Sequence, residues 1–108
     1  MLYSPAMTIR EYELYVPTRT NQGRVIPAAR LARLKKRLLK RFGGLTHFPQ
    51  QNEGLWKWGN VTFRDEIVIL RVLSGDKDKA FWRTLKKDLE RKWGQQSILI
   101  IEREITMV

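Results

Sequence analysis

The chain has 108 residues, a net charge of +10, 43% hydrophobic residues and no cysteine. This length and composition suit one compact domain, and the lack of cysteine excludes disulfides and thiolate metal sites. No apolar run approaches the roughly 20 residues of a membrane-spanning helix, and the first residues lack a signal-peptide pattern. We therefore expect a cytoplasmic protein in which residues 1–8 are an N-terminal extension and residues 9–108 form a single domain.

The first half of the domain has the pattern of a strand followed by a helix. Residues 9–16 alternate between apolar and polar side chains, which predicts a β-strand. Residues 17–27 are polar and predict a loop. Residues 28–42 repeat an apolar side chain every three or four positions, which predicts an amphipathic helix ended by Gly43 and Gly44. Residues 45–54 predict a second loop.

The second half adds a hairpin, a helix and a last strand. Residues 55–58 and 61–73 predict two strands joined by a Gly59-Asn60 turn. Residues 77–93 predict a second amphipathic helix with Asp76 as its N-cap, and residues 97–108 predict the last strand. The order β-α-β-β-α-β favours the ferredoxin-like split β-α-β arrangement, an α+β fold. Its four-stranded antiparallel sheet carries both helices on one face.

The helices leave one face of the predicted sheet uncovered. We assign to the helix-facing side Tyr12, Leu14, Val16, Val68, Leu70, Val72, Leu99 and Ile101. The uncovered side then carries Tyr15, Ile67, Ile69, Leu73, Ile98 and Ile100. Exposing aliphatic surface costs about 25 cal/mol per Å², so we expect a homodimer through this face. The alternative is a shift of one residue in one strand, which would reverse that strand.

The positive charge is concentrated in the two predicted helices. Residues 28–42 carry +7 without a single acid, and residues 77–93 carry +4. The candidate anion- or nucleic-acid-binding residues are the cations away from the apolar stripes: Arg30, Arg33, Lys36, Arg37, Lys40, Arg41, Arg83, Lys86, Lys87 and Arg91. Such clusters bind phosphate backbones, whereas an ordinary solvated helix mixes both signs. An acidic protein is an equally suitable partner, and a merely solvated face is the alternative.

Several function classes are excluded by the residues that are missing. Single-strand RNA readers of this topology stack bases on aromatic side chains of the central strands, but the run EIVILRVL contains none. Nucleic acid contacts are therefore expected on the helices or on the loop around residues 19–24. The sequence contains no Ser-His-Asp set, H-E-x-x-H motif or Gly-rich phosphate loop. We expect a non-enzymatic binding module without a cofactor or metal.

Aromatic residues near the hairpin suggest a second function. Trp56 and Trp58 share one side of a strand and could line a ligand pocket, or instead fill the edge of the core or a dimer interface. His47 is the only histidine, and without a second histidine or a cysteine a metal site is not expected. The carboxylates of Asp65, Glu66, Glu102 and Glu104 could form a magnesium site or a general-base pair. Because arginines stand near them in the sequence, cross-strand ion pairs are the simpler interpretation.

One segment carries a recognisable pattern: F-G-G-x-T, then P, then G-x-W-x-x-G, then D-E. The positions are Phe42, Gly43, Gly44, Thr46, Pro49, Gly54, Trp56, Gly59 and Glu66. Together with the opening YELYVP strand, the pattern resembles a family of small bacterial proteins of uncharacterised function. The resemblance implies a ferredoxin-like fold and draws attention to the corner between the first helix and the hairpin, which could equally be a folding device. Our possible pocket there comprises Thr46, His47, Trp56, Trp58 and Glu66, as the small-molecule or catalytic alternative.

Overall fold

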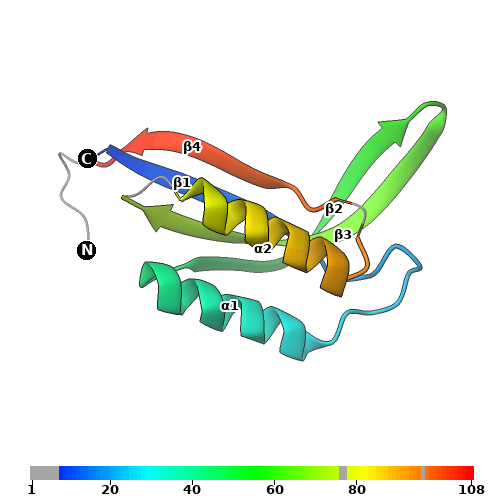
Figure 1. Ribbon diagram of the computed structural model, residues 1–108. Helices are drawn as coiled ribbons and strands as arrows, with labels where there is room; N and C mark the ends of the chain where they lie inside the picture. The colour runs from blue at the N-terminus through cyan, green and yellow to red at the C-terminus, as the bar shows by residue number, and fades with distance from the viewer. Residues whose placement is uncertain (1–7, 76–77, 96) are drawn as a thin grey trace.

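A computed structural model describes residues 8–75, 78–95 and 97–108 (Figure 1). The elements are β1 (Thr8–Pro17), α1 (Ala28–Phe42), β2 (Thr46–Trp58), β3 (Val61–Ser74), α2 (Lys79–Lys92) and β4 (Ile100–Thr106). The strands form one antiparallel sheet in the order β2-β3-β1-β4. Both helices lie on the same side of this sheet (Figure 1). The predicted β-α-β-β-α-β ferredoxin-like fold is confirmed.

Helix α1 has the predicted bounds. Its apolar stripe is buried at Leu34 and Leu38, one turn apart. Pro27, whose φ is fixed near the helical value, occupies the N-cap position. Gly43 ends the helix with a φ of 78°, and its N–H donates to the carbonyl of Leu39 at 2.8 Å. This left-handed conformation carries no Cβ penalty for glycine, which explains why the helix ends there.

Helix α2 buries Trp82, Leu85 and Leu89. Its N-cap is Asp78, whose side chain accepts a hydrogen bond of 3.2 Å from the backbone N–H of Phe81. The predicted cap, Asp76, lies outside the described residues. Within the described ranges, neither α2 nor any other helix has the length and apolar character needed to cross a membrane.

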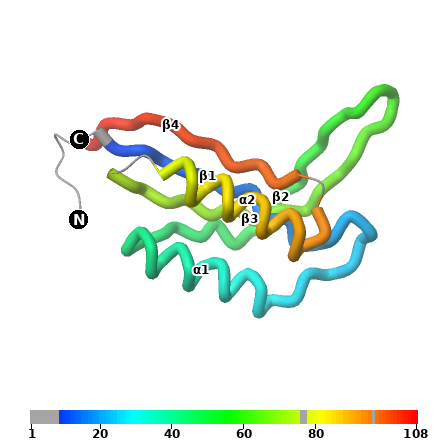
Figure 2. Tube along the Cα trace, viewed as in Figure 1, coloured from blue at the N-terminus to red at the C-terminus, as the bar shows by residue number. Residues whose placement is uncertain are grey.

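The predicted loop over residues 45–54 is wrong, because most of this segment belongs to β2. Its pairing with β3 shifts register between Phe48 and Asn52, around Pro49. A proline cannot donate to a sheet ladder, so it is tolerated on an outer strand at such an irregularity. The interruption hides the strand pattern in the sequence. The resulting hairpin is long, and its outer part turns away from the helix layer and projects beyond the sheet (Figure 2).

The core lies between the helices and the sheet. The predicted helix-facing residues of β1 and β3 are all buried there, and Tyr12 stacks on Trp82 with ring centroids 4.3 Å apart. The assignment in the last strand is wrong by one residue. Ile98 is buried in the core and Ile100 packs against it, whereas Leu99 is 56% exposed.

The reason for this error is the continuous apolar run from Ile98 to Ile101, which contains no alternation to reveal the buried side. Pairing with β1 determines which side of this strand is buried. Ile100 stands opposite the core residue Leu14, so the two side chains share the helix-facing side. The uncovered face therefore carries Leu99 and Ile101 in place of the predicted Ile98 and Ile100.

Candidate functional site

A groove lies on the sheet face opposite the helices, where the hairpin turns away. We call it the hairpin groove, and its volume is about 940 Å³. It is lined by Tyr15, Pro17, Asn21, Asn52, Glu53, Gly54, Leu55, Trp56, Trp58, Phe63, Asp65, Ile67, Ile69, Gln95, Ser97 and Leu99. This volume lies in the range of small-molecule sites.

An aromatic wall forms the hairpin side of this groove. Trp56 and Phe63 face each other across the β2–β3 pair, with stacked rings 4.4 Å apart and an interplanar angle of 16°. The indole N–H of Trp56 donates to a carboxylate oxygen of Asp65 at 3.0 Å. Trp58, two residues along the same side, is 75% exposed. The wall thus presents oriented aromatic surface to solvent.

The charge of the hairpin groove is opposite to that of the chain. The described residues that line it include two acids, Glu53 and Asp65, and neither lysine nor arginine. Glu53 pairs with Arg64 at 2.8 Å. Asp65 forms no ion pair within the described ranges. Although the chain has a net charge of +10, the charged side chains among the described residues that line this groove are both acidic.

The structure divides the five predicted pocket residues between the two sides of the hairpin. Trp56 and Trp58 line the groove. Thr46 pairs with Arg71 much farther along the sheet. Successive side chains of a strand point to opposite faces, so His47 and Glu66 lie on the other side. The predicted convergence of Thr46, Trp56 and Glu66 is wrong.

His47 and Glu66 have partners of their own on that other side. The Nδ1 atom of His47 lies 3.3 Å from Nζ of Lys35. Burial, and then the charge of Lys35, lower the pKa of His47 below its ordinary value. Glu66 accepts a bond of 3.2 Å from Nε of Arg19. Both residues therefore lie on the side away from the groove and do not line it.

An ionic network occupies the uncovered face beyond the groove. Arg71 contacts Glu11 at 2.7 Å and Glu13 at 3.3 Å, and Arg103 contacts the same two carboxylates at 2.8 and 2.7 Å. The hydrogen bond from Arg103 is the main reason that the pKa of Glu13 is lowered. The network separates the apolar residues at the groove end of this face from Leu73, which pairs with Glu11 farther along the sheet.

The predicted ion pairs form at Glu66, Glu102 and Glu104, whereas the prediction for Asp65 is wrong, since it has no ion pair among the described residues. Arg10 of β1 provides the partner for two of the three. It contacts Glu102 at 2.6 Å and Glu104 at 3.7 Å. Both glutamates stand in β4, which pairs directly with β1. The sequence pattern missed Arg10 because strand order, not proximity along the chain, brings these groups together.

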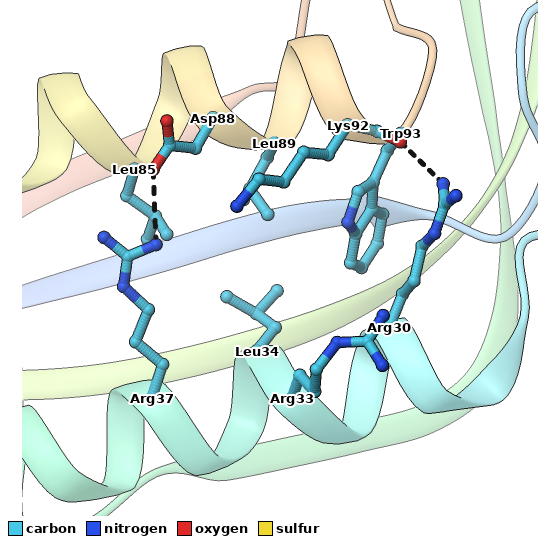
Figure 3. A pocket seen from close by; sticks show the side chains of 9 residues that line it. All are labelled: Arg30, Arg33, Leu34, Arg37, Leu85, Asp88, Leu89, Lys92 and Trp93. Carbon is cyan, nitrogen blue, oxygen red and sulfur yellow. Dashed lines mark hydrogen bonds and ion pairs between the residues drawn. The ribbon is translucent and has the colours of Figure 1, made fainter.

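A second, smaller groove lies between α1 and α2 (Figure 3). We call it the helix groove, and its volume is about 360 Å³. Its lining residues are Arg30, Arg33, Leu34, Arg37, Leu85, Asp88, Leu89, Lys92 and Trp93. Three of the predicted cations, Arg30, Arg33 and Arg37, gather here. Lys92 was missed, although its spacing of four from Asp88 places it on the same side of α2.

The remaining predicted cations lie outside the helix groove, and some are neutralised. Lys86 contacts Glu90 at 2.6 Å, and Arg91 contacts Asp88 at 3.3 Å. Arg41 binds Asp78 and lies over the ring of Phe81, 4.9 Å from its centroid. The other four, Lys36, Lys40, Arg83 and Lys87, are exposed.

Comparison with known proteins gives a fold-level likeness. No family model and no curated protein matches the chain. Among solved structures, the chain is similar to a phage SAM lyase in complex with S-methyl-5′-thioadenosine, with a TM-score of 0.65 and 13% sequence identity. The match covers 100% of this chain and 90% of that chain. At this identity, the likeness shows a shared α+β fold over the whole of this chain and 90% of the other.

Proposed function

We propose that the protein binds an uncharged or cationic nucleoside in the hairpin groove, with S-adenosylmethionine and S-methyl-5′-thioadenosine as the model ligands. The observation that carries this proposal is the combination of exposed aromatic rings with a carboxylate that lacks an ion-pair partner and with no cation among the described lining residues. A phosphate-bearing ligand would find no cationic side chain among the described lining residues. A neutral or positive aromatic ligand would not be repelled.

The aromatic wall suits a purine ring. Trp56 is 42% exposed although one side of its indole is stacked on Phe63. A base that stacks on such an aromatic side chain gains about 1–3 kcal/mol. The amides of Asn21, Asn52 and Gln95 lie in the same groove and can hydrogen-bond the polar edge of a base.

Asp65 suits the positive sulfonium of S-adenosylmethionine. Cations are attracted to the faces of tryptophan rings, and Trp56 and Trp58 line the groove with this carboxylate. S-methyl-5′-thioadenosine is uncharged, so it would use the aromatic wall without the carboxylate. The two ligands therefore separate the contributions of stacking and charge.

The likeness to the SAM lyase supports this choice of ligands. That protein was solved with S-methyl-5′-thioadenosine bound, and it shares the fold along the whole of this chain. Cleavage of S-adenosylmethionine is therefore the activity to measure alongside binding.

We also propose that the protein is a homodimer through the groove side of the sheet and the hairpin. Leu55, Trp58, Val61 and Leu99 are each more than half exposed. Contiguous apolar patches of several hundred Å² usually mark contact sites. A second copy would cover the hairpin and leave the ligand enclosed between the two chains.

Isothermal titration calorimetry with both ligands tests the proposal, and chromatography of the same mixtures measures cleavage of S-adenosylmethionine. We expect the wild-type protein to bind both ligands and Trp56→Ala to weaken each by roughly tenfold. Leu39→Ala removes an apolar side chain from α1 that is 52% exposed, compared with 42% for Trp56, and should change neither affinity. Absence of binding by the folded wild-type protein would contradict the proposal.

A further inference from the structure

The helix groove concentrates positive charge around a buried apolar floor. Leu34, Leu85, Leu89 and Trp93 form the floor and are all buried. Figure 3 shows Arg30 and Arg37 reaching from α1 towards α2, and Lys92 extending over the gap from α2. Helix α1 contains no acid. Asp88 is the one acid among the described lining residues.

Two of the four cations around this groove are already held in place. Arg37 contacts Asp88 at 3.5 Å. Arg30 donates a hydrogen bond of 2.6 Å to the backbone carbonyl of Lys92, at the C-terminal end of α2. These contacts orient both guanidinium groups, which lowers the entropy lost when they bind a further anion.

The other two cations, Arg33 and Lys92, have no side-chain partner in the described part of the chain. Both are exposed at the rim of the groove. Asp88 is shared between Arg37 and Arg91, so it does not neutralise them. Their positive charge is therefore uncompensated at the rim of the groove, which attracts an anion.

We propose that the helix groove is a binding site for the phosphate groups of a nucleic acid strand. Arg33 and Lys92 supply the charge that binds, while Arg30 and Arg37 supply oriented guanidinium donors. Guanidinium groups match phosphate oxygens in geometry and charge. The site lies on the helix side of the protein, opposite the hairpin groove, so its test is independent of the nucleoside proposal.

The cations continue beyond the groove, which favours a polymer over a single phosphate. Arg33, Arg37 and Lys40 follow one another along α1 at spacings of four and three, so they stand in a row about 5–6 Å apart. At the other end, the loop that carries Arg24 packs against the end of α2, where Asn21 donates to the carbonyl of Gly94 at 3.3 Å. A nucleic acid strand places an anion on every residue, whereas acidic protein surfaces interrupt theirs with neutral side chains.

Two matched double variants test the site. Arg33→Glu with Lys92→Glu reverses the unpaired charges of the groove. Arg83→Glu with Lys87→Glu makes the same change in net charge on exposed α2 positions outside it. Binding of a labelled DNA strand of about 20 nucleotides is measured by fluorescence anisotropy at about 50 and 200 mM salt. Circular dichroism confirms folding, and Gln replaces Glu in both pairs if either variant unfolds.

We expect the groove variant to lose roughly tenfold or more in affinity and to show a shallower salt dependence. The control variant should remain within about threefold of wild type. Equal losses in the two variants would mean that only net charge matters and would overturn the proposal. So would absence of DNA binding by the wild type, or displacement of the DNA by polyglutamate at an equal concentration of charge.

Discussion

The indole N–H of Trp56 donates a hydrogen bond of 3.0 Å to the carboxylate of Asp65 across the β2–β3 hairpin. This bond orients the aromatic ring and leaves the carboxylate charge without an ion-pair partner among the described residues. It occurs at the hairpin groove of a strongly basic chain. The two residues thus join the stacking surface of the groove to its negative charge.

The charge of Asp65 should distinguish the two model ligands. Asp65→Asn keeps the shape and an acceptor for Trp56 but removes the negative charge. A charge interaction at such a partly exposed site contributes up to about 1 kcal/mol. The affinity for S-adenosylmethionine should therefore fall about two- to fivefold, while that for S-methyl-5′-thioadenosine should stay unchanged, as measured by calorimetry.

Asp88→Asn provides the control for this prediction, because it removes a carboxylate from the helix groove. It should alter neither affinity. If Asp65→Asn weakened both ligands equally, the carboxylate would serve only to position the indole, and its role in ligand charge selection would be wrong.

The exposed apolar residues around the hairpin should hold the proposed homodimer together. Trp58 and Leu99 are 75% and 56% exposed, so a lysine at either position should fold normally but place a charge in the interface. We expect Trp58→Lys combined with Leu99→Lys to halve the mass measured by light scattering. Leu39→Lys, on α1, should retain the wild-type mass. A monomeric wild-type protein would refute the dimer.

Glu13 should make folding sensitive to acid. Its pKa is lowered by the hydrogen bond from Arg103, with a further contribution from Arg71. A carboxyl whose pKa is lower in the folded state than in the unfolded state stabilises the protein at pH values above its unfolded-state pKa, near 4.5. The stabilisation is lost as the pH falls through the folded-state pKa. Glu13→Gln should cost about 1.5–3 kcal/mol at pH 7.

Urea unfolding at several pH values measures this cost, which should shrink steadily below about pH 4.5. Glu104→Gln is the matched control, since its carboxylate is 64% exposed and lies 3.7 Å from Arg10. It should change the unfolding free energy by less than about 1 kcal/mol. A pH-independent cost at Glu13 would show that its ion pairs are not the source of the stabilisation.

His47 should add a second pH dependence at higher pH. Burial and the neighbouring Lys35 lower its pKa, so the folded state prefers the neutral imidazole. Above about pH 6.5 the imidazole is neutral in the folded and the unfolded chain, so it does not affect stability. Below that pH the unfolded chain binds a proton more readily than the folded chain, and the protein should lose stability. Replacing it in His47→Gln should flatten the change in unfolding free energy between about pH 7 and pH 5.5. An unchanged slope would contradict this assignment.

Much of the fold was predictable from local pattern. Helix α1 was placed with both ends correct, because its apolar stripe is regular and Gly43 follows it directly. The inner half of β2 was not predictable, since the register shift near Pro49 removes the alternation on which strand prediction depends. The face of the sheet to which Ile98 points was equally unpredictable, because the pairing of the last strand with β1 determines it.

Only those residues of the candidate site that lie on one strand could be placed together from the sequence. Trp56 and Trp58 are two residues apart, so their common side was evident from the sequence. His47 and Glu66 were placed wrongly because proximity along the chain does not determine which face of a hairpin a side chain occupies. The separation of negative and positive grooves depends on how the hairpin turns from the sheet, which is a tertiary property that no local pattern records.

The most direct measurement of the nucleoside proposal uses the four tryptophans as reporters. Trp56 and Trp58 line the hairpin groove, whereas Trp82, in α2, and Trp93, at its C-terminal end, are buried in the core. In ¹⁵N-labelled protein titrated with S-methyl-5′-thioadenosine, the indole N–H signals of Trp56 and Trp58 should shift while those of Trp82 and Trp93 stay in place. Unmoved signals for Trp56 and Trp58 at a saturating ligand concentration would contradict the account.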